Sequence, residues 1–266
     1  YLTTSLYMQQ TGDIEFLNEE NTYFKDAQIG RGEHRDNLWS DGEGNMQLSE
    51  DDTPYRGTVL EHLLIQHLTS FYDVGEHNHI RLRGADWNDG LDMAEKRGES
   101  VAFTALYGGN LRDLAKDIMT LSKKTGKDTI SLAKEIEVLL NADKTVYDSI
   151  DEKHKVLNAY CNAVGHKVSG EKVSVDCTKL CNVLNEMSSW IADHIRKTEW
   201  ITNKEGNSWF NGYYDNSGNA VEGDFSSGVR MMLTGQVFAI MSGTATDEQV
   251  AKIVKSADDY LYDGAI

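Results

Sequence analysis

Apolar residues recur at helical spacing along much of the chain. The clearest case begins at Thr58, where Thr58 and Glu61 form a capping box ahead of a repeating apolar face. This pattern predicts a helix from about 58 to 73, ending at Gly75. Other apolar faces predict helices at about 2–11, 100–121, 177–197 and 230–243, a last helix from Thr246, and one that carries Ile130, Leu132, Ile136, Val138, Leu139 and Leu140.

Convincing alternating strands are scarce in this sequence. The 23 glycines against a single proline indicate helices joined by turns of glycine and asparagine. We therefore predict an all-α fold built from antiparallel helix pairs. Gly108-Gly109 is expected to kink or split the helix that carries it. Residues from about 25 to 54 are loop-like, which is typical either of a functional loop or of a flexible crossing.

The net charge of the chain limits the classes of partner that it is expected to bind. A formal net charge of -17 repels nucleic acid phosphates and anionic membranes, so we expect neither as a partner. No apolar run is long enough to span a membrane. Three cysteines, an odd and low number, argue against a disulfide framework and fit a reducing compartment.

Several histidines and cysteines could be ligands or core residues. Cys177 and Cys181 lie one helical turn apart, with His166 and Cys161 nearby in sequence, but a structural zinc site usually has two tight ligand pairs. We favour core cysteines. His62 and His67 are interpreted as packing or surface residues. His77 and His79 could equally line a cleft or belong to a solvated turn.

The stretch Asp86-Trp87-Asn88-Asp89-Gly90 carries the strongest candidate chemistry. Asn, Asp and Gly favour a turn, so a helix through it is not expected. An aromatic ring beside a carboxylate suits a sugar site, because the ring can stack on a pyranose while the carboxyl protonates the glycosidic oxygen. From the spacing alone we favour the simpler interpretation, an Asx-rich turn with a tryptophan in the core. A calcium-binding EF-hand is excluded because its required Gly and Glu are replaced by Leu91 and Arg97.

This stretch, followed by Arg97-Gly-Glu-Ser-Val101, resembles the catalytic signature of the inverting β-disaccharide phosphorylases. That family includes cellobiose, cellodextrin, chitobiose, laminaribiose and β-1,2-oligoglucan phosphorylases, with related cyclic glucan synthases. Further segments fall in the family's order and extend the resemblance over most of the chain outside about 122–186, which we predict to be an insertion. These segments are Thr11-Gly-Asp13 with Phe16-Leu17, Thr58 to His62, Gly75-Glu-His77, Tyr214-Asp-Asn216 with Gly218, and Met232 to Gly243.

The resemblance implies that residues 1–266 are the central to C-terminal part of an (α/α)6 catalytic barrel, an incomplete toroid. By similarity, Asp89 is the general acid and Trp87 packs against the sugar, while Asp86 either binds a sugar hydroxyl or fixes the turn. No metal or cofactor is expected, because inorganic phosphate is itself the nucleophile and replaces a catalytic base. The family implies phosphate ligands outside this chain, so we expect the chain alone to be inactive.

The expected reaction is reversible phosphorolysis of a β-linked gluco-oligosaccharide to an α-sugar 1-phosphate, by a cytoplasmic enzyme that is a homodimer when complete. Alternatives are a domain of a cyclic-glucan-synthase-like enzyme and a non-catalytic helical module that binds β-glucan. The chain departs from the family at Arg83-Gly-Ala85 and Leu91-Asp-Met93, which border the acceptor sugar and leave the linkage open. For Arg81, Arg83 and Arg97 we favour surface or loop-bracing roles over phosphate binding.

Overall fold

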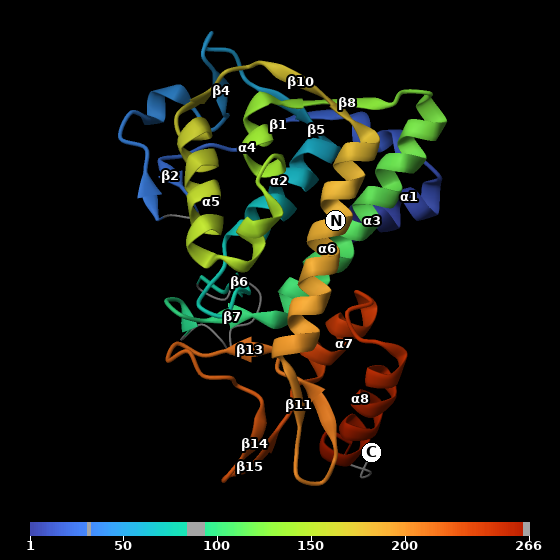
Figure 1. The fold of residues 1–266 in the computed structure, drawn as a ribbon. Helices are drawn as coiled ribbons and strands as arrows, with labels where there is room; N and C mark the ends of the chain where they lie inside the picture. The colour runs from blue at the N-terminus through green and yellow to red at the C-terminus, as the bar shows by residue number, and fades with distance from the viewer. Residues whose placement is uncertain (31–32, 84–93, 263–266) are drawn as a thin grey trace. The chain divides into compact units, whose positions relative to one another are not determined.

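The computed structural model describes residues 1–30, 33–83 and 94–262 (Figure 1). The chain divides into two compact units, unit 1 with residues 1–72 and 114–184, and unit 2 with residues 73–113 and 185–266. Two long helices contribute residues to both units: α3 (Val101–Thr125) and α6 (Cys177–Thr198).

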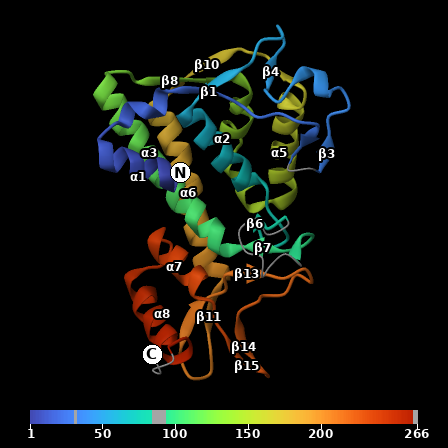
Figure 2. The same cartoon turned by 180° about the vertical axis from the view of Figure 1, so that it is seen from behind.

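Unit 1 contains the first helices of the chain and the stretch predicted to be an insertion. Its remaining elements are α1 (Leu2–Thr11), β1 (Glu20–Thr22), β2 (Gln28–Ile29), β3 (His34–Arg35), β4 (Leu48–Ser49), β5 (Arg56–Thr58), α2 (Val59–Tyr72), β8 (Thr129–Ala133), α4 (Glu137–Leu140), α5 (Ile150–Val164), β9 (Lys167–Val168) and β10 (Lys172–Asp176). Helices α2 and α5 lie side by side in both views (Figures 1 and 2).

A buried carboxylate ties the parts of unit 1 together. Glu61 in the first turn of α2 is completely buried and accepts hydrogen bonds from the hydroxyls of Tyr23 (2.8 Å) and Tyr55 (3.1 Å) and from the backbone N–H of Ala133 (2.7 Å). The backbone N–H of Glu61 donates to the Thr58 hydroxyl, which is one of the two hydrogen bonds of the predicted capping box. The Glu61 side chain is used elsewhere, so only half of the box forms. The carboxylate therefore fixes α2 to β5 and β8 instead of capping its own helix.

Unit 2 combines short strands with two C-terminal helices. Its elements are β6 (Ile80–Arg81), β7 (Glu99–Ser100), β11 (Trp200–Thr202), β12 (Ser208–Phe210), β13 (Tyr213–Tyr214), β14 (Gly223–Phe225), β15 (Gly228–Arg230), α7 (Leu233–Met241) and α8 (Asp247–Tyr260).

Side chains from α7 and α8 satisfy the free edge of strand β12. The Gln236 amide of α7 accepts from the N–H of Phe210 (2.9 Å) and donates to its carbonyl (2.8 Å). The Ser256 hydroxyl of α8 does the same for Ser208, accepting from its N–H and donating to its carbonyl, each at 2.9 Å. Since buried backbone groups need partners, these two polar residues allow the helices to cover a strand that pairs with β11 alone.

The prediction of an all-α fold, and with it the incomplete (α/α)6 toroid, is wrong for this structure. Of the described residues, 52% are helical and 19% are in strands, and the strands form several small sheets, so the class is mixed α and β. Most of these strands have only two or three residues. Such short segments show too few alternations for the period-two signal that identifies a strand.

The helices themselves were predicted more accurately than the class. Helices α1, α2, α3, α6, α7 and α8 confirm the expected elements, and the Thr246–Gln249 capping box at the start of α8 forms in full. The helix expected over residues 130–140 is wrong: Thr129–Ala133 is strand β8, paired with β10, and only Glu137–Leu140 is α-helical. β-Branched residues and the partner strand override the apparent helical period there.

Gly108-Gly109 does not interrupt α3, which contradicts the predicted break. A Cβ atom on Gly108 would meet Ile191 at 2.8 Å, and one on Gly109 would meet the backbone Cα of Ser242 at 2.8 Å. The glycines are therefore sites of close helix packing, not helix breakers. Among the described residues, no helix is long and apolar enough to cross a membrane.

Candidate active site

The described residues on either side of the candidate motif lead into strands of a small antiparallel sheet of unit 2. The strand order is β13–β7–β6, with Arg81 opposite Glu99 and Tyr214 opposite Glu99 on its other side. Beyond the strands, the N–H of Leu82 donates to the carbonyl of Gly98 at 2.9 Å. Asp86, Trp87 and Asp89 lie within residues 84–93, outside the described residues, so their expected roles stay predictions.

The segment that follows the motif is held by a remote turn. The side-chain oxygen of Asn216 accepts from the N–H groups of Lys96 (3.0 Å) and Arg97 (2.9 Å). Gly98 is required at its position because a Cβ atom would collide with the carbonyl oxygen of Ala94. The returning strand therefore reaches Glu99 along a path set by the 215–218 turn.

Two arginines near the motif each form a bidentate ion pair with a carboxylate. Arg97 binds Glu76 through two contacts of 2.7 Å, and Arg83 binds Asp73 through contacts of 2.8 and 2.7 Å. Hydrogen bonding to Glu76 raises the pKa of Arg97. Both contacts agree with the loop-bracing roles expected from the sequence.

Glu99 organises the approach to the motif. Its carboxylate is fully buried and accepts from the backbone N–H groups of His77 (3.0 Å) and His79 (3.0 Å), and it pairs with Nδ1 of His77 at 2.6 Å. A Cβ atom on Gly75 would meet the Glu99 side chain at 2.5 Å, so the chain turns closely around the carboxylate. The expectation of a solvated turn does not hold for His79, which has no exposed surface.

A second buried carboxylate, Glu199, follows the end of α6. It accepts from Nε2 of His79 (3.0 Å), from the Asn211 amide (2.9 Å) and from the Tyr214 hydroxyl (3.0 Å). Burial alone would raise the pKa of Glu199, but these hydrogen bonds and the neighbouring His79 lower it to about 2. Glu199 is thus held as an ionised acceptor, which suits a supporting role more than that of a proton donor.

Aromatic rings connect the two carboxylates. His77 stacks on Tyr214 with ring centroids 3.6 Å apart and an interplanar angle of 8°, while Tyr214 donates to Glu199. On the other side, His194 of α6 stacks on Trp190 at 4.8 Å, and its Nε2 contacts the carbonyl of His77 at 2.9 Å. The result is a continuous packed network of four chain segments behind the sheet.

Glu222 is a third buried carboxyl, in the segment after β13. It accepts from the N–H groups of Gly212 and Met232, both at 2.8 Å, and is 2% exposed. Burial raises its pKa to about 8, with the two backbone hydrogen bonds opposing that rise. Glu222 therefore holds its proton near neutral pH.

Sequence reasoning found the motif but not most of the residues that hold the strands on either side of it. Glu199, Tyr214 and Asn211 come from segments more than 100 residues along the chain from the motif, so no local pattern joins them to it. The one local signal was the pair His77 and His79 on either side of Asn78, which the sequence offered as possible cleft-lining residues. Cys161, Cys177 and Cys181 are buried, as expected for core residues, and so is His67, whose pKa burial lowers to about 4.

Comparison with known proteins adds a distant relationship to an enzyme. No family model matches the chain. A solabiose phosphorylase from Paenibacillus borealis is 27% identical over 146 residues, which is 53% of this chain and 15% of the relative. The chain is thus distantly similar to a glycoside phosphorylase over part of its length, and the match spans a small share of that longer protein.

Proposed function

We propose that this chain carries the acid-bearing part of a glycoside phosphorylase that cleaves a β-linked gluco-oligosaccharide with inorganic phosphate. The observation that supports this most is that segments far apart in the sequence come together in space. Three segments that resemble the phosphorylase family in sequence, 75–77, 97–100 and 214–218, contact one another in unit 2 beside the residues that flank the motif. The distant similarity to solabiose phosphorylase supports the same assignment independently.

The proposed reaction needs one carboxylic acid. A phosphate oxygen attacks the anomeric carbon from the face opposite the leaving group while the bond to the glycosidic oxygen breaks. Asp89 gives its proton to that oxygen, so the products are an α-sugar 1-phosphate and a free acceptor sugar. Water needs a second carboxylate to become a nucleophile in an inverting hydrolase, but phosphate is already an anion. Trp87 would pack against the sugar and Asp86 would bind a hydroxyl or hold the turn.

The buried network serves this chemistry by positioning. An acid must lie within hydrogen-bond reach of the glycosidic oxygen, and a displacement of about 1 Å can cost about a hundredfold in rate. Glu99 and Glu199 lock the strands on which the loop begins and ends. Asp89 must also remain protonated, which burial or the neighbouring carboxylate Asp86 would favour by raising its pKa.

The experiment is phosphate release from α-glucose 1-phosphate, followed on the complete gene product with glucose, cellobiose, laminaribiose and sophorose as acceptors. We expect release with one acceptor, which names the linkage, and no release from the Asp89→Asn protein. Release that persists in Asp89→Asn, or sugar binding without release for any acceptor, would contradict the proposal.

A further inference from the structure

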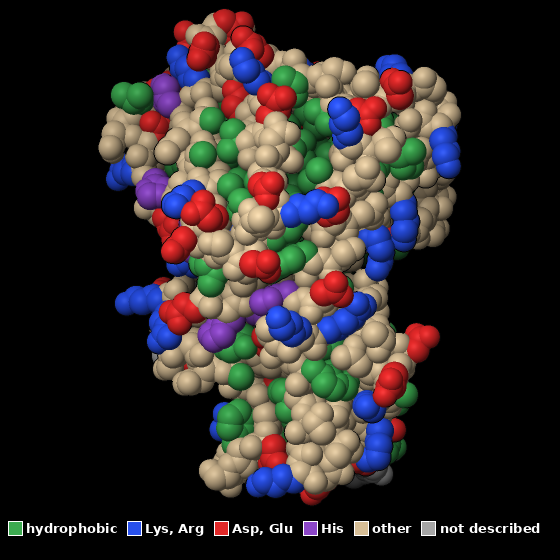
Figure 3. Space-filling view, viewed as in Figure 1, with side chains coloured by type: hydrophobic (Ala, Val, Ile, Leu, Met, Phe, Trp, Pro, Cys, Tyr) green, Lys and Arg blue, Asp and Glu red, His purple; other side chains and the backbone are tan. Residues whose placement is uncertain are grey.

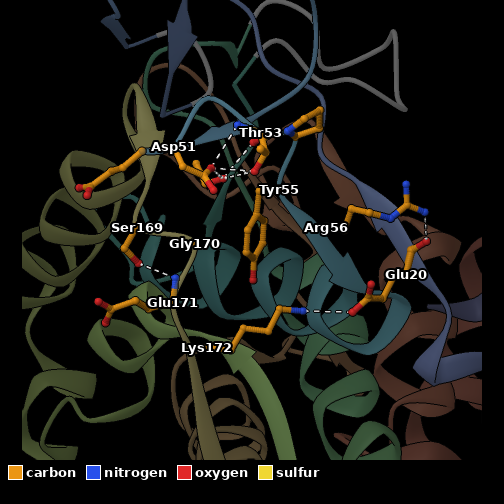
Figure 4. A pocket seen from close by; sticks show the side chains of 12 residues that line it. Glu20, Asp51, Thr53, Tyr55, Arg56, Ser169, Gly170, Glu171 and Lys172 are labelled. Atoms are coloured by element: carbon orange, nitrogen blue, oxygen red, sulfur yellow. Dashed lines mark hydrogen bonds and ion pairs between the residues drawn. The ribbon is translucent and has the colours of Figure 1, made fainter.

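Unit 1 carries an open cleft, distinct from the motif loop of unit 2. Its volume is about 690 Å³, within the roughly 300–1,000 Å³ typical of sites for small ligands. Three segments line it: Glu20, residues 49–56 except Asp52, and residues 169–172 (Figure 4). The last of these lies in the stretch of about 122–186 that we predicted to be an insertion, so that stretch supplies one wall.

The polar groups of the cleft are fixed before any ligand arrives. One oxygen of Asp51 accepts from the hydroxyls of Ser49 (2.8 Å) and Thr53 (2.7 Å). On the other side, the Lys172 ammonium lies 3.3 Å from Glu20, and Arg56 donates to the carbonyl of Glu20 at 2.8 Å. A site whose hydrogen-bonding groups are already ordered loses less entropy on binding.

One residue that lines the cleft is aromatic: Tyr55, which is largely buried, with 7% of its surface exposed. Figure 4 shows the Tyr55 ring between the Asp51 turn and Lys172. The ring is held in place because its hydroxyl binds the buried carboxylate of Glu61 at 3.1 Å. The Lys172 ammonium lies 5.6 Å from the ring centroid, so the aliphatic stem of this lysine and the ring form the apolar part of the cleft.

The charges of the lining select the class of ligand. Four carboxylates, from Glu20, Glu50, Asp51 and Glu171, face two cations, Arg56 and Lys172, so an anion such as phosphate is disfavoured. No group of three His, Cys, Asp or Glu residues spaced to hold a metal ion occurs in the described part of the chain. A neutral ligand rich in hydroxyls fits best, since carboxylate, ammonium and guanidinium groups all hydrogen-bond hydroxyls strongly.

We propose that this cleft is a second, non-catalytic site that binds a neutral β-linked oligosaccharide. The choice of a β-linked glucan rests on the proposed function, while the preference for a neutral polyhydroxylated ligand rests on the cleft alone.

The test is a titration of isotope-labelled protein with cellotetraose, laminaritetraose and sophorotetraose, followed by amide chemical shifts. We expect one of these sugars to shift the amides of residues 49–56 and 169–172. Lys172→Met and Arg56→Met remove the donors but keep the apolar stems. Each should weaken binding at the cleft by about tenfold, because a hydrogen bond to a charged group contributes about 1.5 kcal/mol. Lys179→Met, an exposed lysine outside the cleft, should leave the affinity unchanged.

The outcomes separate this inference from the proposed function. Saturable shifts at the cleft without phosphate release would support the second site and contradict the phosphorylase assignment. Shifts confined to the segments near the motif, at residues 77–83 and 94–100, would overturn the second site and leave the phosphorylase assignment standing. Cleft shifts of equal affinity in Lys172→Met, Arg56→Met and Lys179→Met would also overturn it.

Discussion

Glu99 and Glu199 are buried carboxylates that each accept three hydrogen bonds, two of those to Glu99 from the backbone N–H groups of His77 and His79. Backbone donors buried beside a carboxylate have no alternative partner in water. The network is therefore intolerant of a change at either acceptor. At the scale of single residues, we attribute the shape of the motif's surroundings to these two side chains.

Glu99→Gln is expected to lower the free energy of unfolding by about 2 kcal/mol. The substituted side chain has an NH₂ group in place of one carboxylate oxygen, and this group cannot accept a hydrogen bond from the backbone N–H groups that the carboxylate now binds. A buried polar group left without a hydrogen bond costs about 1–3 kcal/mol. Urea denaturation of the variant measures the change. Glu95→Gln is the matched control, because Glu95 is exposed in the same segment and should change stability by less than about 0.5 kcal/mol. Equal effects in both variants would refute the structural role of Glu99.

Glu222 should make stability depend on pH. Its pKa is about 8 in the folded chain, against an ordinary value of 4.5, because burial penalises the charged carboxylate. Below about pH 4.5 both states hold the proton. Between about pH 4.5 and 8 the unfolded chain releases it while the folded chain keeps it, so stability falls as pH rises through this window.

The measurement is the free energy of unfolding of the parent protein relative to Glu222→Gln, in urea, at several pH values from about 5 to 8. Because Gln cannot ionise, the variant lacks the contribution of Glu222 to the pH dependence. The contributions of all other groups cancel in the difference between the two proteins. We expect the parent to lose stability relative to the variant as pH rises. A constant difference across the window would show that the pKa of Glu222 is not raised.

At the scale of elements, α3 shows why a local rule can fail. Two adjacent glycines cost about 2 kcal/mol of helix propensity together, which is why the sequence predicted a break. Tertiary contact reverses that preference, because the bare backbone lets Ser242 approach Gly109 and Ile191 approach Gly108. The Ser242 carbonyl is also held by the Arg112 guanidinium at 2.7 Å, so this neighbour cannot easily move.

Gly109→Ala should therefore destabilise the chain by about 1–3 kcal/mol, despite gaining about 1 kcal/mol of helix propensity, because the added methyl overpacks the contact with Ser242. Thermal unfolding followed by circular dichroism checks this. Thr120→Ala lies at an exposed position of the same helix and should be nearly neutral. A Gly109→Ala chain as stable as the parent would mean that the glycine contact has no role in packing.

The helices could be predicted because their faces repeat over many residues, as in α2 and α6. The strands could not be predicted, because β6, β7 and β13 contain two residues each and are defined as strands only by their pairing with one another. The same holds for the site: the motif is a local string, whereas Glu199 and Tyr214 reach it only through the fold. The segment 129–133 combined both difficulties, since its apolar spacing matched a helix and its partner strand lies about 40 residues away.

At the scale of the whole molecule, the formal net charge is -17. Figure 3 shows Asp and Glu side chains interspersed with Lys and Arg on the face in view. A neutral sugar experiences little of this field, so its recognition depends on local hydrogen bonds and aromatic contacts.

The proposal that Asp89 donates a proton to the leaving sugar is tested most directly by varying the leaving group. In the phosphorolytic direction, the complete gene product and its Asp89→Asn variant are compared on the natural disaccharide and on a 2,4-dinitrophenyl β-glycoside of the same sugar. The aryl group leaves without protonation. We predict that Asp89→Asn lowers kcat about 10²–10⁴-fold on the disaccharide, and less than about tenfold on the aryl glycoside. Equal losses on both substrates, or no loss on the disaccharide, would contradict the claim.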